Sequence, residues 1–250
     1  MSNWIFLRGL MRESRHWGDF PETFRKVTRV DNIVAPDIPG NGRLNQLQSP
    51  ASIEAMVEWV RADLQRQQIM PPYSMLALSM GAMVAVAWAE KYPEELQRIV
   101  LINTSVAGYS PFYYRLRPEN YAGVLFFMLF RSAMARQQQV MRLTSRMARF
   151  SRHREAILAQ WLQFAKENPV SMTNVFRQLL AAMRFRAGMR PPAMPVLLLC
   201  SQHDDLVNVQ CSVTLCEKWQ AEIRMHPVAG HDLPLDDGEW VAEMVKDWME

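Results

Sequence analysis

The 250-residue chain lacks the features that would assign it to a disulfide-rich, secreted or membrane-spanning class. Its three cysteines, Cys200, Cys211 and Cys216, are an odd number without metal-ligand spacing, so we expect reduced thiols and no metal site. No basic segment precedes a long apolar run at the N-terminus, so the start of the chain does not indicate a secretory signal. The longest apolar run in the middle of the chain, residues 122–130, is far shorter than the roughly 20 residues that span a bilayer. We therefore expect a cytoplasmic protein without a transmembrane segment.

An excess of charge of one sign is also missing, since 28 Lys and Arg nearly balance 25 Asp and Glu. The balance hides an asymmetry, because residues 105–190 contain 14 Lys and Arg against 3 Asp and Glu, a local charge of +11. Two interpretations remain open: a solvated helix face, and a positive surface that recruits an anionic substrate or an acidic carrier protein. We expect no nucleic-acid partner, since no binding motif accompanies the charge. Arg142, Arg146 and Arg149 are spaced so that they would share one face of a helix.

Short apolar runs rich in β-forming residues alternate with helical patterns at both ends of the chain. This alternation predicts the α/β class, with a doubly wound and mostly parallel sheet. Strands are expected at residues 4–7, 32–35, 75–78, 98–102, 196–200 and 222–227. Helices are expected from Ser52 onward, over residues 80–91 and over residues 240–248.

Residues 105–190 carry no strand pattern and are rich in Arg, Met and aromatic residues, with helix breaks at Pro118 and Pro169. A connection of this length must have structure of its own. We interpret it as a helical cap, or lid, inserted between the fourth and fifth strands, with residues 1–104 and 191–250 as the core. Most of its aromatic side chains should pack between helices, and some should roof a substrate pocket. The candidates include Phe126, Phe127, Phe130, Trp161 and Phe164.

The clearest chemical motif lies where the third expected strand runs straight into a helix, at Leu76-Ala77-Leu78-Ser79-Met80-Gly81-Ala82. A serine at such a junction sits on a sharp turn that exposes its hydroxyl at the carboxyl end of the sheet. The turn requires small neighbours, which Ala77 and Gly81 provide. The helix N-terminus also directs the backbone N–H of Met80 toward a developing oxyanion. Ser79 is therefore a candidate nucleophile, although serines between small residues are also common outside active sites.

A serine nucleophile needs a base, and the base needs a carboxylate that orients it. Asp204 lies a few residues past the fifth expected strand, and His231 follows the last one. Taken singly, each pattern is more typical of an ordinary surface residue than of an active site. Together with Ser79, however, they occur in the order Ser, Asp, His, and each follows a strand end, where open α/β sheets build their sites. The combination predicts a Ser-His-Asp triad.

With these residues the chain resembles the α/β-hydrolase superfamily over essentially its whole length. The resemblance is to the branch of small serine esterases with a helical cap, similar to pimeloyl-carrier-protein methyl ester esterases. The Gly-x-Ser-x-Gly elbow is matched by residues 77–81, and the Asp-x-Pro-Gly-x-Gly turn by residues 37–42. The acid motif corresponds to residues 201–207 and the Gly-His motif to residues 230–231. The His-Gly-x oxyanion segment is matched by Arg8-Gly9-Leu10.

Three positions depart from the family pattern. Ala77 replaces the first glycine of the elbow, as it does in some lipases. Arg8 replaces the histidine of the oxyanion segment, a position that shapes this loop. Ser201 replaces a glycine of the acid motif, but the family register still favours Asp204 over Asp205 as the acid.

The resemblance implies that Ser79 attacks an acyl carbonyl, that His231 accepts its proton and that Asp204 holds the imidazole. It also implies that the backbone N–H groups of Leu10 and Met80 bind the oxyanion, and it implies no metal or organic cofactor. We therefore expect a hydrolase that cleaves a carboxylic ester or thioester through an acyl-enzyme. Two alternatives remain: a carbon–carbon bond hydrolase, whose elbow often has the same Ser-Met-Gly, and a hydrolase-fold binding protein without turnover.

Overall fold

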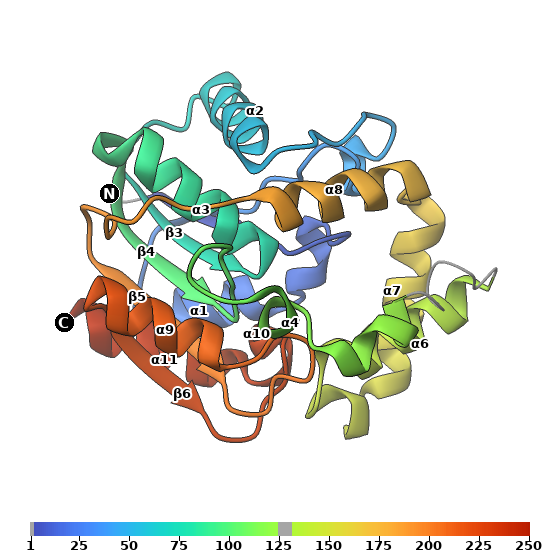
Figure 1. Cartoon of the computed structure of the whole chain (residues 1–250). Helices are drawn as coiled ribbons and strands as arrows, with labels where there is room; N and C mark the ends of the chain where they lie inside the picture. Colours follow the sequence, from blue (N-terminus) through green and yellow to red (C-terminus); the bar gives the residue numbers. More distant parts are fainter. Residues whose placement is uncertain (1–2, 125–131) are drawn as a thin grey trace.

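The structure is a computed structural model that describes residues 3–124 and 132–250. Its centre is a six-stranded sheet in the order β2-β1-β3-β4-β5-β6, in which every pairing is parallel (Figure 1). The strands are β1 Asn3–Leu7, β2 Asn32–Val34, β3 Tyr73–Leu78, β4 Leu96–Ile102, β5 Val196–Ser201 and β6 Glu222–His226. All six predicted strands are confirmed, and none of their ends is shifted by more than two residues.

Helices cover both faces of the sheet (Figure 1). The main ones are α1 Phe20–Thr28, α2 Ile53–Arg66, α3 Met80–Lys91, α9 Gln210–Trp219 and α11 Gly238–Met249. The helices α2, α3 and α9 pack on one face, and α1 and α11 pack on the other. Successive residues of β1 point to opposite faces, so that Ile5 and Leu7 pack on the α3 side, whereas Trp4 and Phe6 pack with α1. This double burial explains why the central strands β1, β3, β4 and β5 are mainly apolar.

Local signals explain where these helices begin. Ser52 caps α2 by accepting a hydrogen bond of 3.2 Å from the N–H of Ala55, as its position predicts. The helix α3 occupies the predicted residues 80–91. The helix α11 begins two residues earlier than predicted, because Asp237 caps it by accepting the N–H of Trp240 at 3.0 Å. Short helices elsewhere are the 3₁₀ turns Ser14–Trp17, Gly42–Leu44 and Pro93–Glu95, and α10 Leu233–Asp236.

Where the structure describes residues 105–190, they contain helices and no strand of the sheet. These are α4 Phe112–Arg115, α6 Ala133–Thr144, α7 Arg154–Glu167 and α8 Met172–Arg184, with 3₁₀ turns at Pro118–Asn120 and Ala148–Phe150. An isolated β-bridge pairs Ala107 with Arg186, so the two ends of the segment meet. The assignment of the segment as a cap stays a prediction. Three of its aromatic residues, and one arginine, lie outside the described residues: Phe126, Phe127, Phe130 and Arg131.

The composition-based expectations are partly tested. None of the described helices is both long and apolar enough to cross a membrane, and the cytoplasmic location stays a prediction. The three cysteines form no disulfide, as predicted. Burial raises the pKa of Cys200 to about 12, so this thiol is not ionised at neutral pH.

Candidate active site

Ser79 occupies the turn between β3 and α3. Its backbone φ of +57° and ψ of −116° lie in a region that residues other than glycine rarely adopt. Such a conformation persists only where the surroundings impose it. Here the N–H of Ser79 donates to the carbonyl of Ile102 at 2.9 Å, and the hydroxyl of Thr104 donates to the carbonyl of Ser79 at 3.1 Å. The turn therefore holds a half-buried serine at the carboxyl end of the sheet.

The elbow lies very close to the end of β1. A Cβ atom at Gly81 would lie 2.4 Å from the carbonyl oxygen of Leu7 and 2.7 Å from that of Arg8. A Cβ atom at Gly9 would lie 3.3 Å from the Cβ of Ser79 and 3.7 Å from its hydroxyl oxygen. The close approach explains the glycine at position 81, and it places the segment after β1 directly against Ser79.

We expect Gly81→Ala to destabilise the protein by about 1–3 kcal/mol, a usual cost of overpacking, and to lower activity by moving the segment after β1. Helix propensity alone would stabilise the alanine variant by about 1 kcal/mol. A lower free energy of unfolding in the variant would therefore reflect the close contact with Leu7. Urea unfolding of both proteins measures this change in stability. Gly188→Ala is the control, because its Cβ would lie 3.4 Å from the end of the flexible Glu90 side chain. A stabilised Gly81→Ala variant would contradict the close packing of the elbow.

Asp204 and His231 meet in the interior of the protein. The Oδ2 atom of Asp204 lies 2.7 Å from Nδ1 of His231, and the two residues are 2% and 4% exposed. The other carboxylate oxygen, Oδ1, accepts the N–H groups of Leu206 at 2.8 Å and Val207 at 2.9 Å. Between an ionised carboxylate and a neutral imidazole, the carboxylate only accepts hydrogen bonds, which places the imidazole hydrogen on Nδ1 and leaves Nε2 as an acceptor. This is the tautomer that a general base requires.

The structure brings two of the three predicted triad residues into hydrogen-bonding contact. Within the described residues, the hydroxyl of Ser79 forms no hydrogen bond with His231. Catalytic hydrogen bonds often form fully only when substrate is bound, so a missing bond between Ser79 and His231 is compatible with their proposed roles. Asp205, the other choice for the acid, faces elsewhere, and its carboxylate lies 3.4 Å from the guanidinium of Arg146. The geometry therefore favours Asp204 over Asp205.

Asn103 is absent from the predicted site, yet it joins two of its loops. Its Nδ2 donates to the carbonyl of His231 at 2.8 Å, to that of Gly230 at 3.2 Å and to the hydroxyl of Ser201 at 3.1 Å. Its Oδ1 accepts the N–H of Ser201 at 2.8 Å. The only sequence signal is a polar residue directly after the buried strand β4. Asn103 thus connects the end of β5 to the loop that carries His231.

The two predicted oxyanion donors have free N–H groups. Neither Leu10 nor Met80 donates its N–H to another described residue. Met80 is the first residue of α3, where N–H groups have no partner within the helix. The N–H of the next residue after Leu10, Met11, is instead taken by the side chain of Gln178 at 2.9 Å. Both donors are therefore available on segments that border Ser79.

Arg8, which replaces the histidine of the oxyanion segment, pairs with Asp232. Its Nη1 and Nη2 atoms donate to the two carboxylate oxygens at 3.0 and 2.6 Å, and both side chains are 4% exposed. Burial raises the pKa of Asp232, but the charge and hydrogen bonds of Arg8 outweigh it, and the pKa lies below its usual range. The ion pair therefore persists at neutral pH. It links the segment after β1 to the loop of His231.

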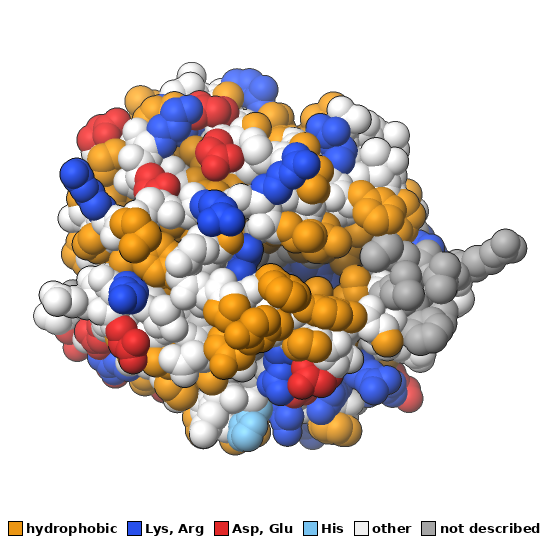
Figure 2. Space-filling view, viewed as in Figure 1, with side chains coloured by type: hydrophobic (Ala, Val, Ile, Leu, Met, Phe, Trp, Pro, Cys, Tyr) orange, Lys and Arg blue, Asp and Glu red, His pale blue; other side chains and the backbone are white. Residues whose placement is uncertain are grey.

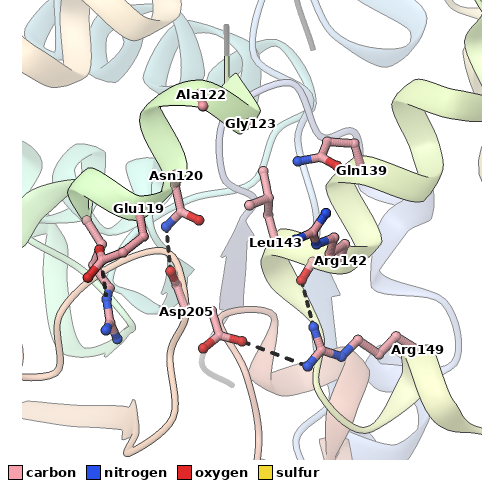
Figure 3. A pocket seen from close by; sticks show the side chains of 10 residues that line it. Glu119, Asn120, Ala122, Gly123, Gln139, Arg142, Leu143, Arg149 and Asp205 are labelled. Atoms are coloured by element: carbon pink, nitrogen blue, oxygen red, sulfur yellow. Dashed lines mark hydrogen bonds and ion pairs between the residues drawn. The ribbon is translucent and has the colours of Figure 1, made fainter. Parts of the chain in front are cut away.

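Two cavities lie next to these loops. The smaller, of about 230 Å³, is lined by Leu10 and by residues of α6, α7 and α8. The larger, of about 630 Å³, is lined by Asp205, Arg142 and Arg149, among other residues (Figure 3). Ser79 lines neither of them, so neither is centred on the candidate nucleophile. Within residues 3–124 and 132–250, no group of three or more His, Cys, Asp or Glu could hold a metal ion.

The three arginines expected on one helix face do not share a helix. The helix α6 ends at Thr144, after which the chain turns and brings backbone N–H groups to a carboxylate at the end of α10. Arg146 lies 3.4 Å and Arg149 lies 4.0 Å from the carboxylate of Asp205. Arg149 also donates to the carbonyl of Arg142 at 3.0 Å (Figure 3). The prediction that Arg142, Arg146 and Arg149 share one helix face is therefore wrong.

Comparison with known proteins agrees with this architecture. A sequence model described as the alpha/beta hydrolase family matches residues 4–244. An esterase from Thermogutta terrifontis superposes with a TM-score of 0.78 at 20% identity, covering 100% of this chain and 89% of that one. A 2-hydroxy-6-oxo-6-phenylhexa-2,4-dienoate hydrolase from Rhodococcus sp. strain RHA1 gives 0.80 at 18% identity, covering 99% and 90%. An enol-lactonase from Burkholderia xenovorans LB400 gives 0.79 at 17% identity, covering 100% and 92%.

Identities this low show a common fold and no more. A sequence relative, the uncharacterised protein YbdG of Bacillus subtilis (strain 168), is 26% identical over 80 residues. That match covers 32% of this chain and 25% of the relative, so this chain aligns with only a quarter of the relative's length.

Proposed function

This chain belongs to the α/β-hydrolase family, whose members are hydrolases, and we propose that it cleaves carboxylic esters or thioesters through an acyl-enzyme. The observation that carries the proposal is the buried hydrogen bond between Asp204 and His231, together with the strained turn of Ser79. The three residues follow β5, β6 and β3 in a parallel sheet. Because the carboxyl ends of parallel strands meet at one edge, this arrangement supports a single site.

In the proposed mechanism, Nε2 of His231 accepts the proton of the Ser79 hydroxyl while its oxygen attacks the acyl carbonyl. Asp204 holds the imidazole in the required tautomer and stabilises its charged form. The N–H groups of Leu10 and Met80 bind the oxyanion, each contributing about 3–4 kcal/mol to the stability of the transition state. The protonated His231 then gives its proton to the leaving alcohol or thiol. Water, activated by the same imidazole, hydrolyses the acyl-enzyme.

A fluorophosphonate probe and a series of p-nitrophenyl esters of rising chain length test this function. We expect the probe to label Ser79, and we expect ester hydrolysis without added metal or organic cofactor. Labelling without ester hydrolysis, together with cleavage of a diketone substrate, would favour the carbon–carbon bond alternative. A folded protein that neither reacts with the probe nor turns over would favour the binding-protein alternative.

We also propose that residues 105–190 form a cap over the site. The carboxylate of Asp236 supports this assignment, because it accepts the N–H of Gly230 at 2.7 Å and that of Arg146 at 2.8 Å. One of these residues precedes His231 and the other belongs to the inserted segment. The segment is therefore tied to the loop that carries the proposed base.

The charge of the proposed cap supports an anionic substrate or an acidic carrier protein as partner. Figure 2 shows Lys and Arg side chains at the lower right of this face, in the region where α6 and α7 lie in Figure 1. Hydrophobic side chains gather beside them over α4, where Phe112 is 72% exposed. Arg142, Arg152 and Arg154 are exposed, whereas Arg146 is half-buried beside Asp205. The exposed arginines are therefore the better candidates for a recruiting surface.

We expect simultaneous Arg142→Glu, Arg152→Glu and Arg154→Glu substitutions to lower kcat/KM for a carrier-bound acyl substrate roughly tenfold or more. Small neutral esters should be nearly unaffected, because the proposed triad lies on the core. The difference should shrink with added salt, which screens exposed charges over about 8 Å at physiological ionic strength. Steady-state kinetics on both substrates at low and high salt measure it. Equal losses would indicate damaged packing, and no loss would indicate a solvated face.

A further inference from the structure

The cavity of about 230 Å³ adjoins the proposed site. One wall is the turn at residues 9–12, which is closed by a hydrogen bond of 3.2 Å from the N–H of Arg12 to the carbonyl of Gly9. Leu10, which carries a proposed oxyanion donor, lines the cavity within this turn. Gly9, the residue before Leu10, borders the hydroxyl of Ser79. A short acyl chain could therefore connect a group bound in the cavity to a carbonyl at the serine.

Arg12 is a buried cation without an anionic partner among the described residues. It is 9% exposed, and its guanidinium stacks on the ring of Trp161, 3.9 Å from the ring centroid. Its Nη1 donates only a long hydrogen bond of 3.4 Å to Gln137, and its Nη2 has no partner. Buried charges in proteins are normally paired, since desolvation penalises them otherwise. An unpaired guanidinium that lines a cavity points to an anionic ligand.

The charged neighbours of Arg12 are already engaged. Arg8 and Asp232 neutralise each other through two hydrogen bonds. The carboxylate of Glu13 accepts a hydrogen bond from Arg15. Burial, together with the charge of Arg8, lowers the pKa of Arg12 to about 9, so Arg12 is still a cation at pH 7. None of these groups supplies the missing anion.

His16 adds a second donor to the same cavity. Its Nδ1 accepts the N–H of Glu13 at 3.1 Å, so the ring hydrogen lies on Nε2. Burial and the charges of Arg12 and Arg8 hold the pKa of His16 well below its usual range, which keeps the ring neutral. The cavity is thus lined by a cationic guanidinium and by a neutral imidazole that carries an N–H donor.

We propose that this cavity binds the carboxylate at the far end of the substrate's acyl group, with Arg12 as its partner. The preferred substrates are then half-esters or half-thioesters of short dicarboxylic acids. A guanidinium matches a planar carboxylate with two parallel N–H groups, and the stacking on Trp161 fixes the plane of this fork. The cavity is smaller than the roughly 300–1,000 Å³ of typical ligand sites, which favours a short acyl chain. This specificity rests on the proposed hydrolysis at Ser79.

The test compares two chromogenic substrates with the same number of acyl carbons, mono-p-nitrophenyl glutarate and p-nitrophenyl valerate. We expect the wild-type protein to prefer the half-ester in kcat/KM, after correction for spontaneous hydrolysis. Arg12→Met should lower the ratio of the two kcat/KM values on the order of 30–100-fold, as the loss of a charge-assisted hydrogen bond does. Arg12→Lys keeps the charge without the fork and should lie in between. Arg43→Met, which changes an exposed arginine beside the cavity wall, should leave the ratio unchanged.

Binding of glutarate gives a second readout that does not depend on turnover of the half-ester. Glutarate should inhibit hydrolysis of the valerate ester at much lower concentrations in the wild type than in Arg12→Met, and inorganic phosphate should not inhibit at those concentrations. Circular dichroism is the control for the fold of the Arg12→Met variant. A wild type without preference for the half-ester, equal losses on both esters, or inhibition by phosphate but not glutarate would overturn the carboxylate subsite. Absence of all ester hydrolysis and of fluorophosphonate labelling would contradict the proposed function instead.

Discussion

Ser79→Ala is expected to lower kcat for ester hydrolysis by roughly 10⁴–10⁶ while the fold stays intact. Alanine keeps the Cβ atom, so it adopts the positive φ of this turn with no more strain than serine does. The hydrogen bonds that hold the turn, to Ile102 and from Thr104, use the backbone of Ser79 and are retained. The substitution therefore removes only the oxygen that His231 is proposed to deprotonate.

Initial rates with a p-nitrophenyl ester measure the loss, and the same variant should no longer react with a fluorophosphonate. Ser212→Ala is a matched control, because Ser212 is a buried serine in α9, 2% exposed and away from the elbow. This control should hydrolyse the ester at close to the wild-type rate. Turnover of Ser79→Ala within about tenfold of wild type would remove Ser79 from the mechanism, since the loss of a triad member costs far more.

The parts of the fold that depend on local sequence could be predicted. Residues 75–78 of β3 and residues 196–200 of β5 are continuous apolar runs, because helices cover both faces of these strands. The junction at Ser79 is recognisable because the strand, the small residues and the helix follow one another within a few positions. Asp204 and His231 could be proposed because each follows a strand, and parallel strands end at the same edge of a sheet.

The contacts between distant segments could not be predicted in this way. Arg8 and Asp232 are 224 positions apart, and nothing near either residue indicates its partner. Asn103 is an ordinary polar residue after a strand until the fold places it against Ser201 and the loop of His231. Arg12 is likewise one arginine among many in the sequence. Only its burial and the absence of a carboxylate partner in the described residues distinguish it.

The end of α6 shows how a tertiary contact overrides helical spacing. Arg142, Arg146 and Arg149 have the spacing of a helix face, but the helix stops at Thr144. The N–H groups that follow bind Asp236 instead of continuing the helix, with the N–H of Arg146 donating at 2.8 Å. Helix propensity is a weak preference, and a half-buried carboxylate that accepts several hydrogen bonds outweighs it.

Asp204→Asn is expected to lower kcat by about 10⁴, nearly as much as the loss of His231, because it reverses a hydrogen bond. The Oδ1 atom of Asp204 accepts the N–H groups of Leu206 and Val207, so the asparagine carbonyl oxygen should remain at that position. Its NH₂ group then faces Nδ1 of His231, which must accept instead of donate. The imidazole hydrogen moves to Nε2, which can no longer take the proton of the serine.

Asp205→Asn provides the matched comparison, since it makes the same chemical change one residue away. Its carboxylate contacts Arg146 and Arg149 at 3.4 and 4.0 Å and is partly exposed, so its loss should change kcat by less than about tenfold. We would measure kcat of both variants on one p-nitrophenyl ester and check their folds by circular dichroism. The variant with the larger loss identifies the catalytic acid. A larger loss in Asp205→Asn would move the catalytic acid by one residue. Near wild-type rates in both variants would mean that His231 is oriented by Asn103 and the surrounding backbone and needs no carboxylate.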